Sequence, residues 1–285
     1  MNLSAFSAQR CRLGEGPLWD AATETLYWVD SLGPTLYRQR AAEDIKSWQL
    51  EGSQVGSLAV RAQGGLVLAM DQGFYFFDPR SAAVETIAEP LAGRDGLRFN
   101  DGKVDPFGHF VAGAMNIDVD GSENASMYRL TPALEVEEIL DGFQCFNGPC
   151  FSPDGERLYV TGRSPGVIEV FDYGRGQRPR NGRVLVDECD PDGATVDAEG
   201  YIWSAQWEDE CLLRVAPDGH VDTRLAIPGQ VVTSVMFGGS DLRRIFVTTL
   251  GEAYYGAAPA GESPGRVLVV DDSGYRGRPE PRFKG

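Results

Sequence analysis

Residues 193–203 read GATVDAEGYIW and predict two short β-strands joined by a tight turn. Apolar residues flank the turn, and an Asp with a nearby Gly supplies the backbone conformations that a hairpin connection requires. The same arrangement recurs at residues 148–160, GPCFSPDGERLYV, and at residues 102–110, GKVDPFGHF. Because the same hairpin pattern recurs several times in the sequence, the chain is expected to consist of repeated β units.

These hairpins are regularly spaced along the chain. Successive units begin 40, 46, 46, 45 and 41 residues apart, and the residues that open them are Gly16, Gly56, Gly102, Gly148, Gly193 and Ser234. Each hairpin is followed by a third strand and a more polar fourth strand, and four strands in about 40 to 45 residues are typical of a β-propeller blade. The sequence therefore predicts an all-β fold, a six-bladed β-propeller with four antiparallel strands per blade, formed by residues 1–285 as a single domain.

The two ends of the chain are expected to close the ring. Ser4 to Leu13 form a strand without a partner in their own repeat, and this strand is predicted to complete the sixth sheet after Arg266 to Asp271. An open solenoid is the alternative for a repeated sequence. The hairpin turns and the two-residue alternation favour the propeller.

Charge and composition narrow the possible partners. Forty-two acidic residues against 26 basic ones give a formal net charge of −16. This charge repels phosphate backbones and anionic lipid, so neither a nucleic acid nor a membrane is expected as a partner. No apolar run reaches the ~18 residues of a membrane span, and the first residues do not resemble a secretory signal, so a cytoplasmic location is expected. The five cysteines form no CxxC pair and are expected to be free thiols.

The residues directly before the repeat openers should meet on the propeller axis, because the inner strands of all blades begin at the same face. These residues are Glu15, Val55, Asp101, Asn147, Asp192 and Thr233. Four of the six carry a carboxylate or amide oxygen, which suits a hard divalent cation such as Ca²⁺, Mg²⁺ or Mn²⁺, with Zn²⁺ and Fe²⁺ as less usual occupants. Turn formation is an alternative reason for an Asp or Asn before Gly, but it does not explain Glu15.

Several longer motifs carry a family resemblance. They are LGEGPLWD (13–20), RFNDGKVDPFGHFVAGAM (98–115), NGPCFSPDG (147–155), PDGATVDAEGYIWSAQW (191–207) and FGGSDLRRIFVTT (237–249). In order and spacing, over five of the six repeats, they resemble the gluconolactonase and regucalcin (senescence marker protein) family. The resemblance implies a six-bladed propeller that holds one divalent metal ion in its channel and hydrolyses sugar lactones.

The resemblance also implies roles for particular residues. Glu15, Asn147 and Asp192 correspond to the metal ligands, which are three of the four oxygen-bearing residues that repeat position selects. Arg98 and Asn100 resemble the pair that contacts the substrate. Two further residues have weaker assignments: Asp118 lies near an acidic residue that some members use at the channel rim, and Asp101 is expected to orient the turn or the ligands.

These assignments predict a metal-dependent lactonase that opens the ring ester of an aldonolactone, with Asp192 as the general base. A phosphotriesterase-like or aryl-esterase-like hydrolase on the same propeller is one alternative. A propeller that binds a divalent cation without catalysis is the other, since a fold does not dictate a function.

Two segments stand apart from these assignments. Many family members have an Asp after the strand that corresponds to LYVT, whereas this chain has Gly162 and Arg163. This change either removes a carboxylate near the ligands or adds a cation near the substrate. Residues 250–264 form the longest connection and contain Tyr254 and Tyr255. This loop is a candidate lid, with a disordered excursion as the alternative.

Overall fold

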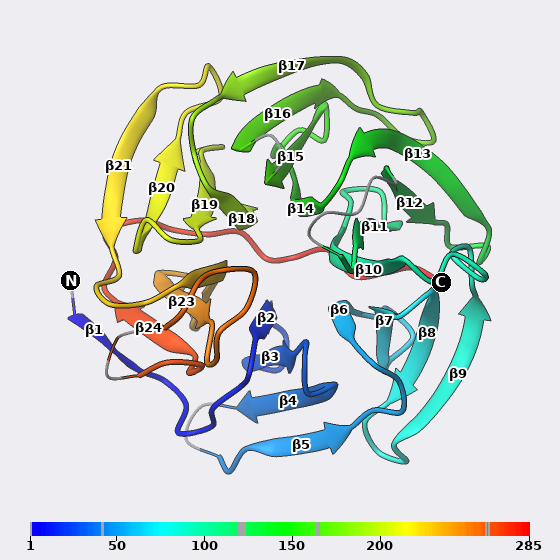
Figure 1. The fold of residues 1–285 in the computed structure, drawn as a ribbon, viewed down its shortest axis with the longest axis horizontal. Helices are drawn as coiled ribbons and strands as arrows, with labels where there is room; N and C mark the ends of the chain where they lie inside the picture. Colours follow the sequence, from blue (N-terminus) through cyan, green and yellow to red (C-terminus); the bar gives the residue numbers. More distant parts are fainter. Residues whose placement is uncertain (1, 41–42, 119–123, 164–165, 260, 262) are drawn as a thin grey trace.

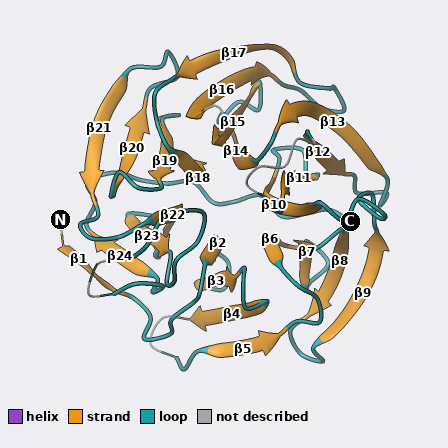
Figure 2. Cartoon of the chain, viewed as in Figure 1, coloured by secondary structure: helices purple, strands orange, loops and turns teal. Residues whose placement is uncertain are grey.

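Six four-stranded antiparallel sheets are arranged in a ring around a central axis (Figures 1 and 2). The computed structural model describes residues 2–40, 43–118, 124–163, 166–259, 261 and 263–285. Within these residues every strand belongs to one of the six sheets and no helix is present. Accordingly, no helix of this part of the chain could span a membrane. The six-bladed β-propeller expected from the repeats is confirmed.

Each blade is built from consecutive strands, except the sixth. Blades 1 to 3, from the axis outward, are β2 (Gly14–Asp20), β3 (Thr25–Asp30), β4 (Thr35–Arg40) and β5 (Lys46–Gln49); β6 (Val55–Val60), β7 (Leu66–Met70), β8 (Gly73–Asp78) and β9 (Ala83–Ala88); and β10 (Leu97–Val104), β11 (Phe110–Asn116), β12 (Ala125–Leu130) and β13 (Val136–Phe143). Blades 4 to 6 are β14 (Phe146–Phe151), β15 (Arg157–Arg163), β16 (Gly166–Asp172) and β17 (Arg180–Val186); β18 (Pro191–Val196), β19 (Ile202–Gln206), β20 (Cys211–Val215) and β21 (Val221–Ala226); and β22 (Val232–Gly238), β23 (Arg244–Thr249), β24 (Leu268–Asp271) and β1 (Asn2–Ala5).

The ring is closed by the N-terminal strand, as expected, but with different bounds. β1 pairs antiparallel with β24, and the register runs from Asn2 opposite Asp271 to Ala5 opposite Leu268. The strand therefore begins and ends earlier in the sequence than the expected range of residues 4–13. Pairing ends because the next two backbone N–H groups, of Phe6 and Ser7, both donate to the same carbonyl, that of Val267.

Every inner strand carries a β-bulge near its beginning. In β14 the register skips from Asn147 opposite Thr161 to Cys150 opposite Tyr159, and the other five inner strands skip at the equivalent place. A bulge leaves residues unpaired and turns their side chains in a new direction. Gly148 lies in this bulge at a φ of 45°, and a Cβ there would sit 2.8 Å from the carbonyl oxygen of Asp192 in the next blade. The repeat positions read from the sequence thus coincide with bulges where adjacent blades touch.

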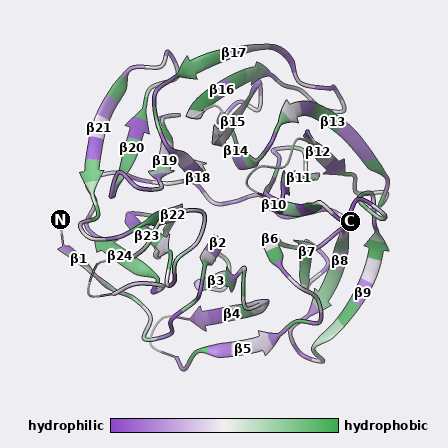
Figure 3. Ribbon diagram, in the orientation of Figure 1, coloured by the Kyte–Doolittle hydropathy of each residue, from purple (hydrophilic) through white to green (hydrophobic). Residues whose placement is uncertain are grey.

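The core lies between the blades. The second strands β3, β7, β11 and β19 are buried at every residue, and their two tryptophans, Trp28 and Trp203, are 0% exposed. Burial of such large aromatic side chains dominates the hydrophobic stabilisation of the blade contacts. The outer strand β9 exposes most of its residues, and Figure 3 shows outer strands such as β21 mixing hydrophilic and hydrophobic positions. The packed second strands therefore fix the positions of the inner strands around the axis.

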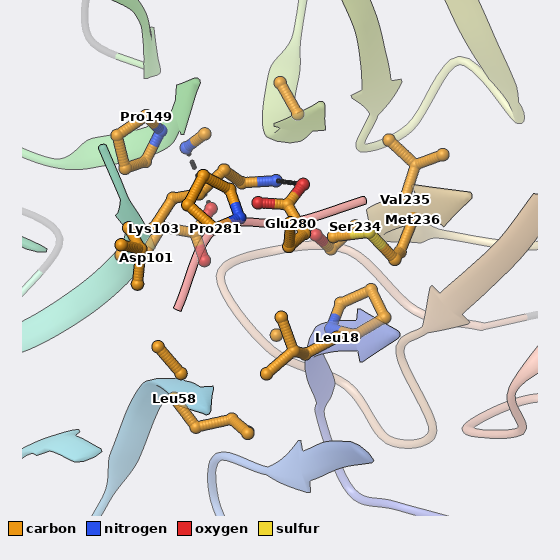
Figure 4. A pocket seen from close by; sticks show the side chains of 17 residues that line it. Leu18, Leu58, Asp101, Lys103, Pro149, Ser234, Val235, Met236, Glu280 and Pro281 are labelled. Carbon is orange, nitrogen blue, oxygen red and sulfur yellow. Dashed lines mark hydrogen bonds and ion pairs between the residues drawn. The ribbon is translucent and has the colours of Figure 1, made fainter. Parts of the chain in front are cut away.

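The C-terminal tail, residues 272–285, closes one end of the channel. In Figure 1 it crosses the centre of the ring, from the side of β24 to the side of β8 and β10. The ring of Phe283 is 0% exposed, and its backbone N–H donates to the carbonyl of Val60 at 2.9 Å. The tail's Glu280 accepts a hydrogen bond from Lys103 Nζ at 3.4 Å (Figure 4). The sequence did not indicate this role, since the tail belongs to no repeat.

A buried carboxylate stabilises blade 5 at its turn between β18 and β19. Asp197 is 1% exposed and accepts hydrogen bonds from Arg214 Nε at 2.8 Å and from Trp203 Nε1 at 3.0 Å. Asp197→Ala is expected to lower the free energy of unfolding by about 1–3 kcal/mol, because the buried Trp203 Nε1 loses its acceptor while Arg214 keeps Asp222 and Glu199 as partners. Urea denaturation measures this. The matched control is Asp218→Ala at an exposed turn, for which a loss below about 1 kcal/mol is expected; equal losses in both variants would contradict the assignment.

Candidate active site

A pocket opens at the end of the channel where the inner strands begin. It takes residues from β2, β10, β14 and β18 and from the segments beside them. The residues that line it are Leu13, Glu15, Arg98, Asn100, Met115, Cys145, Asn147, Pro191, Asp192, Trp207, Tyr254 and Tyr255. Five of the six residues expected to bind metal or substrate are therefore brought together from four blades, while the sixth, Asp118, is not among them.

Glu15 lies in an acidic and buried environment. It is 7% exposed, and its Oε2 accepts a hydrogen bond from the backbone N–H of Gly16 at 3.3 Å. Burial, followed by the negative charges of Asp192 and Asp101, raises the pKa of Glu15 well above its usual value, and Arg98 offsets this only in part. Buried charges need a partner of opposite sign or a metal ion. The site therefore concentrates negative charge in a buried position.

Asn147 is oriented by a chain of hydrogen bonds from blade 3. Asn100 Nδ2 donates to Asn147 Oδ1 and, at 3.0 Å, to the carbonyl of Phe146. The oxygen of Asn100 in turn accepts from Arg98 Nη1 at 3.1 Å. The Cys145 thiol also lies 3.7 Å from Asn147 Oδ1, so this oxygen faces two donors. Arg98 and Asn100 consequently act on the position of Asn147 as well as lining the pocket.

Asp192 projects from the bulge of β18. It is 7% exposed, and its backbone carbonyl accepts a hydrogen bond from the Thr161 hydroxyl at 2.7 Å. Thr161 lies on β15 in blade 4 and is itself 0% exposed, so the bond ties the Asp192 backbone to the neighbouring blade. A side chain whose backbone is held in this way presents a fixed direction to the pocket.

Asp101 faces the channel below the pocket rather than the pocket itself. Its Oδ2 accepts a hydrogen bond from the backbone N–H of Gly148 at 2.8 Å, which holds the bulge next to Asn147. Burial raises the pKa of Asp101, while this hydrogen bond and the charges of Lys103 and Arg98 oppose the rise. In Figure 4, Asp101 and Lys103 lie together beside Pro281 of the C-terminal tail. This geometry is the one expected of a residue that orients a ligand-bearing turn.

Two pocket residues were not anticipated. Cys145 Sγ lies 3.7 Å from Asn147 Oδ1 and 3.9 Å from the thioether sulfur of Met115. Met115 lies opposite Arg98 in the pairing of β10 with β11. Cys145 could have been predicted at the site because it lies two residues before Asn147 in the sequence. Met115 could be found only from the pairing of β10 with β11.

Two other residues are less defined. Asp118 is exposed and follows the end of β11, outside the pocket lining. Its proposed contact with substrate stays a prediction. The backbone of Arg163 pairs with Gly166, but its side chain lies outside the described part of the structure, so neither reading of the Gly162–Arg163 change is tested.

The pocket contains the donor types that a hard divalent cation prefers, which are carboxylate and amide oxygens. Within the described residues there is no group of three or more His, Cys, Asp or Glu side chains in ligating geometry. The expected set needs only two carboxylates, Glu15 and Asp192, together with the amide oxygen of Asn147. Such a set leaves coordination positions open for water and substrate, as Ca²⁺ and Mg²⁺ sites commonly do.

The fold and the pocket place the protein among the six-bladed β-propellers that carry an oxygen-lined pocket at one end of the channel. Residues 13–251 match the family described as SMP-30/Gluconolactonase/LRE-like region, and the chain belongs to this family.

Relatives and solved structures in this family have recorded activities. A 6-deoxy-6-sulfogluconolactonase of Pseudomonas putida is 31% identical over 245 residues, which cover 84% of each chain. A pentonolactonase of Haloferax volcanii is 32% identical over 285 residues, covering 95% of this chain and 94% of that one. The structure of a calcium-binding protein, regucalcin, from Agrobacterium tumefaciens superimposes with a TM-score of 0.88 at 25% identity, covering 98% of this chain and 96% of that chain.

Proposed function

We propose that this protein is a sugar-lactone lactonase that depends on a divalent metal ion and hydrolyses the ring ester of an aldonolactone to the aldonic acid. One observation carries the proposal: Glu15, Asn147 and Asp192, from three different blades, line one buried pocket beside Arg98. The sugar lactonases among its relatives support the same reaction class.

Glu15, Asn147 and Asp192 would hold the metal ion. The description of a related regucalcin as a calcium-binding protein favours Ca²⁺, and the all-oxygen donor set is compatible with Mg²⁺ and Mn²⁺ as well. When bound, the ion supplies a Lewis acid that polarises the ester carbonyl. Its positive charge also compensates the repulsion between Glu15 and Asp192.

Asp192 is the residue suited to act as general base. It accepts a proton from the attacking water while the new C–O bond forms at the ester carbon and the ring C–O bond breaks. Asn147 is uncharged and cannot take this proton, and Glu15 would be held by the cation. Asp192 then passes this proton to the ring oxygen, which leaves as a hydroxyl group of the open-chain acid.

Arg98 and Asn100 are suited to form hydrogen bonds with the oxygens of the sugar. Arg98 is 3% exposed, its Nη1 donates to the carbonyl of Phe99 at 2.8 Å, and its buried Nε has no hydrogen-bond partner in the described structure. A buried donor without a partner costs free energy, which a substrate oxygen would recover. Asp118, at the rim, is proposed to contact the more distant hydroxyl groups.

Arg98→Ala is expected to raise KM by about 10- to 100-fold and to change kcat much less, because the lost donors bind substrate before the reaction as well as during it. Initial-rate measurements over a range of lactone concentrations test this. A fall in kcat with KM unchanged would contradict the binding role.

A substrate panel tests the proposed function against its alternatives. Pentonolactones, hexonolactones, aryl esters and phosphotriesters would be assayed by pH-stat before and after chelation. Chelator-sensitive hydrolysis of the lactones is expected. Turnover of aryl esters or phosphotriesters alone would favour the other hydrolase class. Uptake of a divalent cation without turnover of any substrate would favour a non-catalytic cation-binding propeller.

A further inference from the structure

The loop between β23 and β24 roofs the pocket with two tyrosines. Tyr254 and Tyr255 line the pocket, and their ring centroids are 4.4 Å apart. The base of the loop is packed: Leu250 is 0% exposed and pairs with Leu13 through a β-bridge. The roof is therefore anchored to the blades on the side where Glu15 enters the pocket.

Tyr255 reaches across the mouth of the channel. Its hydroxyl lies 3.0 Å from the carbonyl oxygen of Asn116 and 2.9 Å from that of Ile117, and it donates to these oxygens. These carbonyls belong to blade 3, which is opposite blade 6 in a six-membered ring. Tyr255 also has a φ of 48°, a conformation that residues with side chains seldom adopt, so the surrounding contacts hold it in place.

A second, larger cavity lies beyond this contact. Among the residues that line it are Asp71, Tyr75, Glu89, Asp95, Arg98 and Ile117. It shares Arg98 with the site pocket, and its Ile117 is the residue whose carbonyl Tyr255 binds. The second cavity is the larger of the two. The Tyr255 contact therefore lies at the boundary between a small pocket and a larger neighbouring cavity.

The second cavity suits a neutral, hydroxyl-rich group. Its carboxylates, from Asp71, Glu89 and Asp95, accept hydrogen bonds, and Tyr75 contributes a hydroxyl that donates to Glu89 at 2.9 Å. Acceptors of this kind bind sugar hydroxyls and repel anionic groups. Arg98, with its unpartnered Nε, is the one guanidinium that lines both cavities.

We infer that Tyr255 determines the substrate size of this protein by closing the boundary between the site pocket and the second cavity. With its hydroxyl bound to blade 3, the site takes aldonolactones of a single sugar ring. A second sugar ring, as in a disaccharide aldonolactone, would have to lie in the second cavity and requires this contact to be open. The inference rests on the proposed lactonase function and names a specificity-determining residue within it.

The test compares two substrates in one variant. Tyr255→Phe keeps the aromatic ring and removes only the hydroxyl that holds the roof. Loss of this hydrogen bond, which the two carbonyls share, is expected to raise kcat/KM for lactobionolactone, relative to that for a pentonolactone, by about tenfold. Initial rates, corrected for spontaneous hydrolysis, measure the ratio, and the midpoint of thermal unfolding shows that the variant is folded.

Tyr173→Phe is the matched control. It removes a buried phenol hydroxyl, which donates to Asp105 at 2.8 Å, and Tyr173 lines neither of the two cavities. Its selectivity ratio should equal that of the wild type. The inference is overturned if wild type hydrolyses the pentonolactone and Tyr255→Phe leaves the ratio unchanged, or if both tyrosine variants shift it equally. Absence of lactone hydrolysis in the wild type would instead contradict the proposed function, and this inference with it.

Discussion

Asp192→Ala is expected to reduce lactone hydrolysis by about 10³-fold or more, because a general base alone contributes factors of this size and the same side chain is a proposed metal ligand. Metal affinity, measured by isothermal titration calorimetry, should fall as well. The variant also removes a negative charge that raises the pKa of buried Glu15. The metal-free variant is therefore expected to be at least as stable as the metal-free wild type.

This combination distinguishes a functional role from a structural one. A residue needed only for folding would lower activity and stability together, whereas Asp192→Ala should lower activity without lowering the unfolding temperature of the metal-free protein. Asp187→Ala is the matched control, since Asp187 is an exposed acid five positions earlier in the chain and outside the pocket. Full activity in Asp192→Ala would exclude the assignment.

Removal of divalent metal is the second change with a large expected effect. Dialysis against a chelator should abolish hydrolysis, and addition of Ca²⁺, Mg²⁺ or Mn²⁺ should restore it. Because the ion binds only the folded state, a concentration of about 100 times its Kd should add about 2.7 kcal/mol to the free energy of unfolding. Hydrolysis that persists in protein shown to be metal-free by elemental analysis would contradict the metal dependence.

The stabilisation by metal should also depend on pH. Burial and the charges of Asp192 and Asp101 raise the pKa of Glu15 in the folded state, so without metal the folded protein binds this proton more tightly than the unfolded chain does. The associated stability is fully present below the ordinary pKa of a glutamate, about 4.3, and is lost as the pH rises toward the folded-state pKa. A bound cation pairs with the ionised carboxylate and removes this loss.

The difference in unfolding temperature between metal-loaded and metal-free protein should therefore grow with pH. The difference between the two forms is measured because other groups make stability depend on pH in the opposite sense. Hydrogen bonds from His109 and Tyr173 lower the pKa of Asp105, so the stability that Asp105 contributes is lost as the pH falls. That contribution is common to both forms and cancels. A difference that is constant with pH would contradict the role of Glu15.

Sequence periodicity was sufficient for the ring because each blade depends on local hairpins. The intervals between Gly16, Gly56 and the later openers reflect one recurring bulge, so equivalent residues could be aligned without coordinates. The same alignment selected Glu15, Asn147 and Asp192, which line one pocket. The alignment alone could not show that Asp101 lies outside this pocket. Repeat position gives the height of a residue along the axis, but it does not give the direction in which a bulge turns the side chain.

Features that depend on contacts between distant segments were not predictable in this way. The tail that carries Glu280 and Phe283 has no counterpart in the repeat, and its position is set by partners such as Lys103 and Val60 far earlier in the chain. Tyr255 was recognisable as part of a long loop, but its hydrogen bonds with Asn116 and Ile117 join segments about 140 residues apart. No local pattern encodes such pairings.

Ring closure by β1 has a consequence for synthesis of the chain on the ribosome. β1 is the first strand to be made, while its partner β24 (Leu268–Asp271) is the last. β1 must therefore remain without its native neighbour until β24, more than 260 residues later, has been translated. The sixth sheet, to which the roof of the pocket between β23 and β24 is attached, can be completed only after the other five sheets have been synthesised.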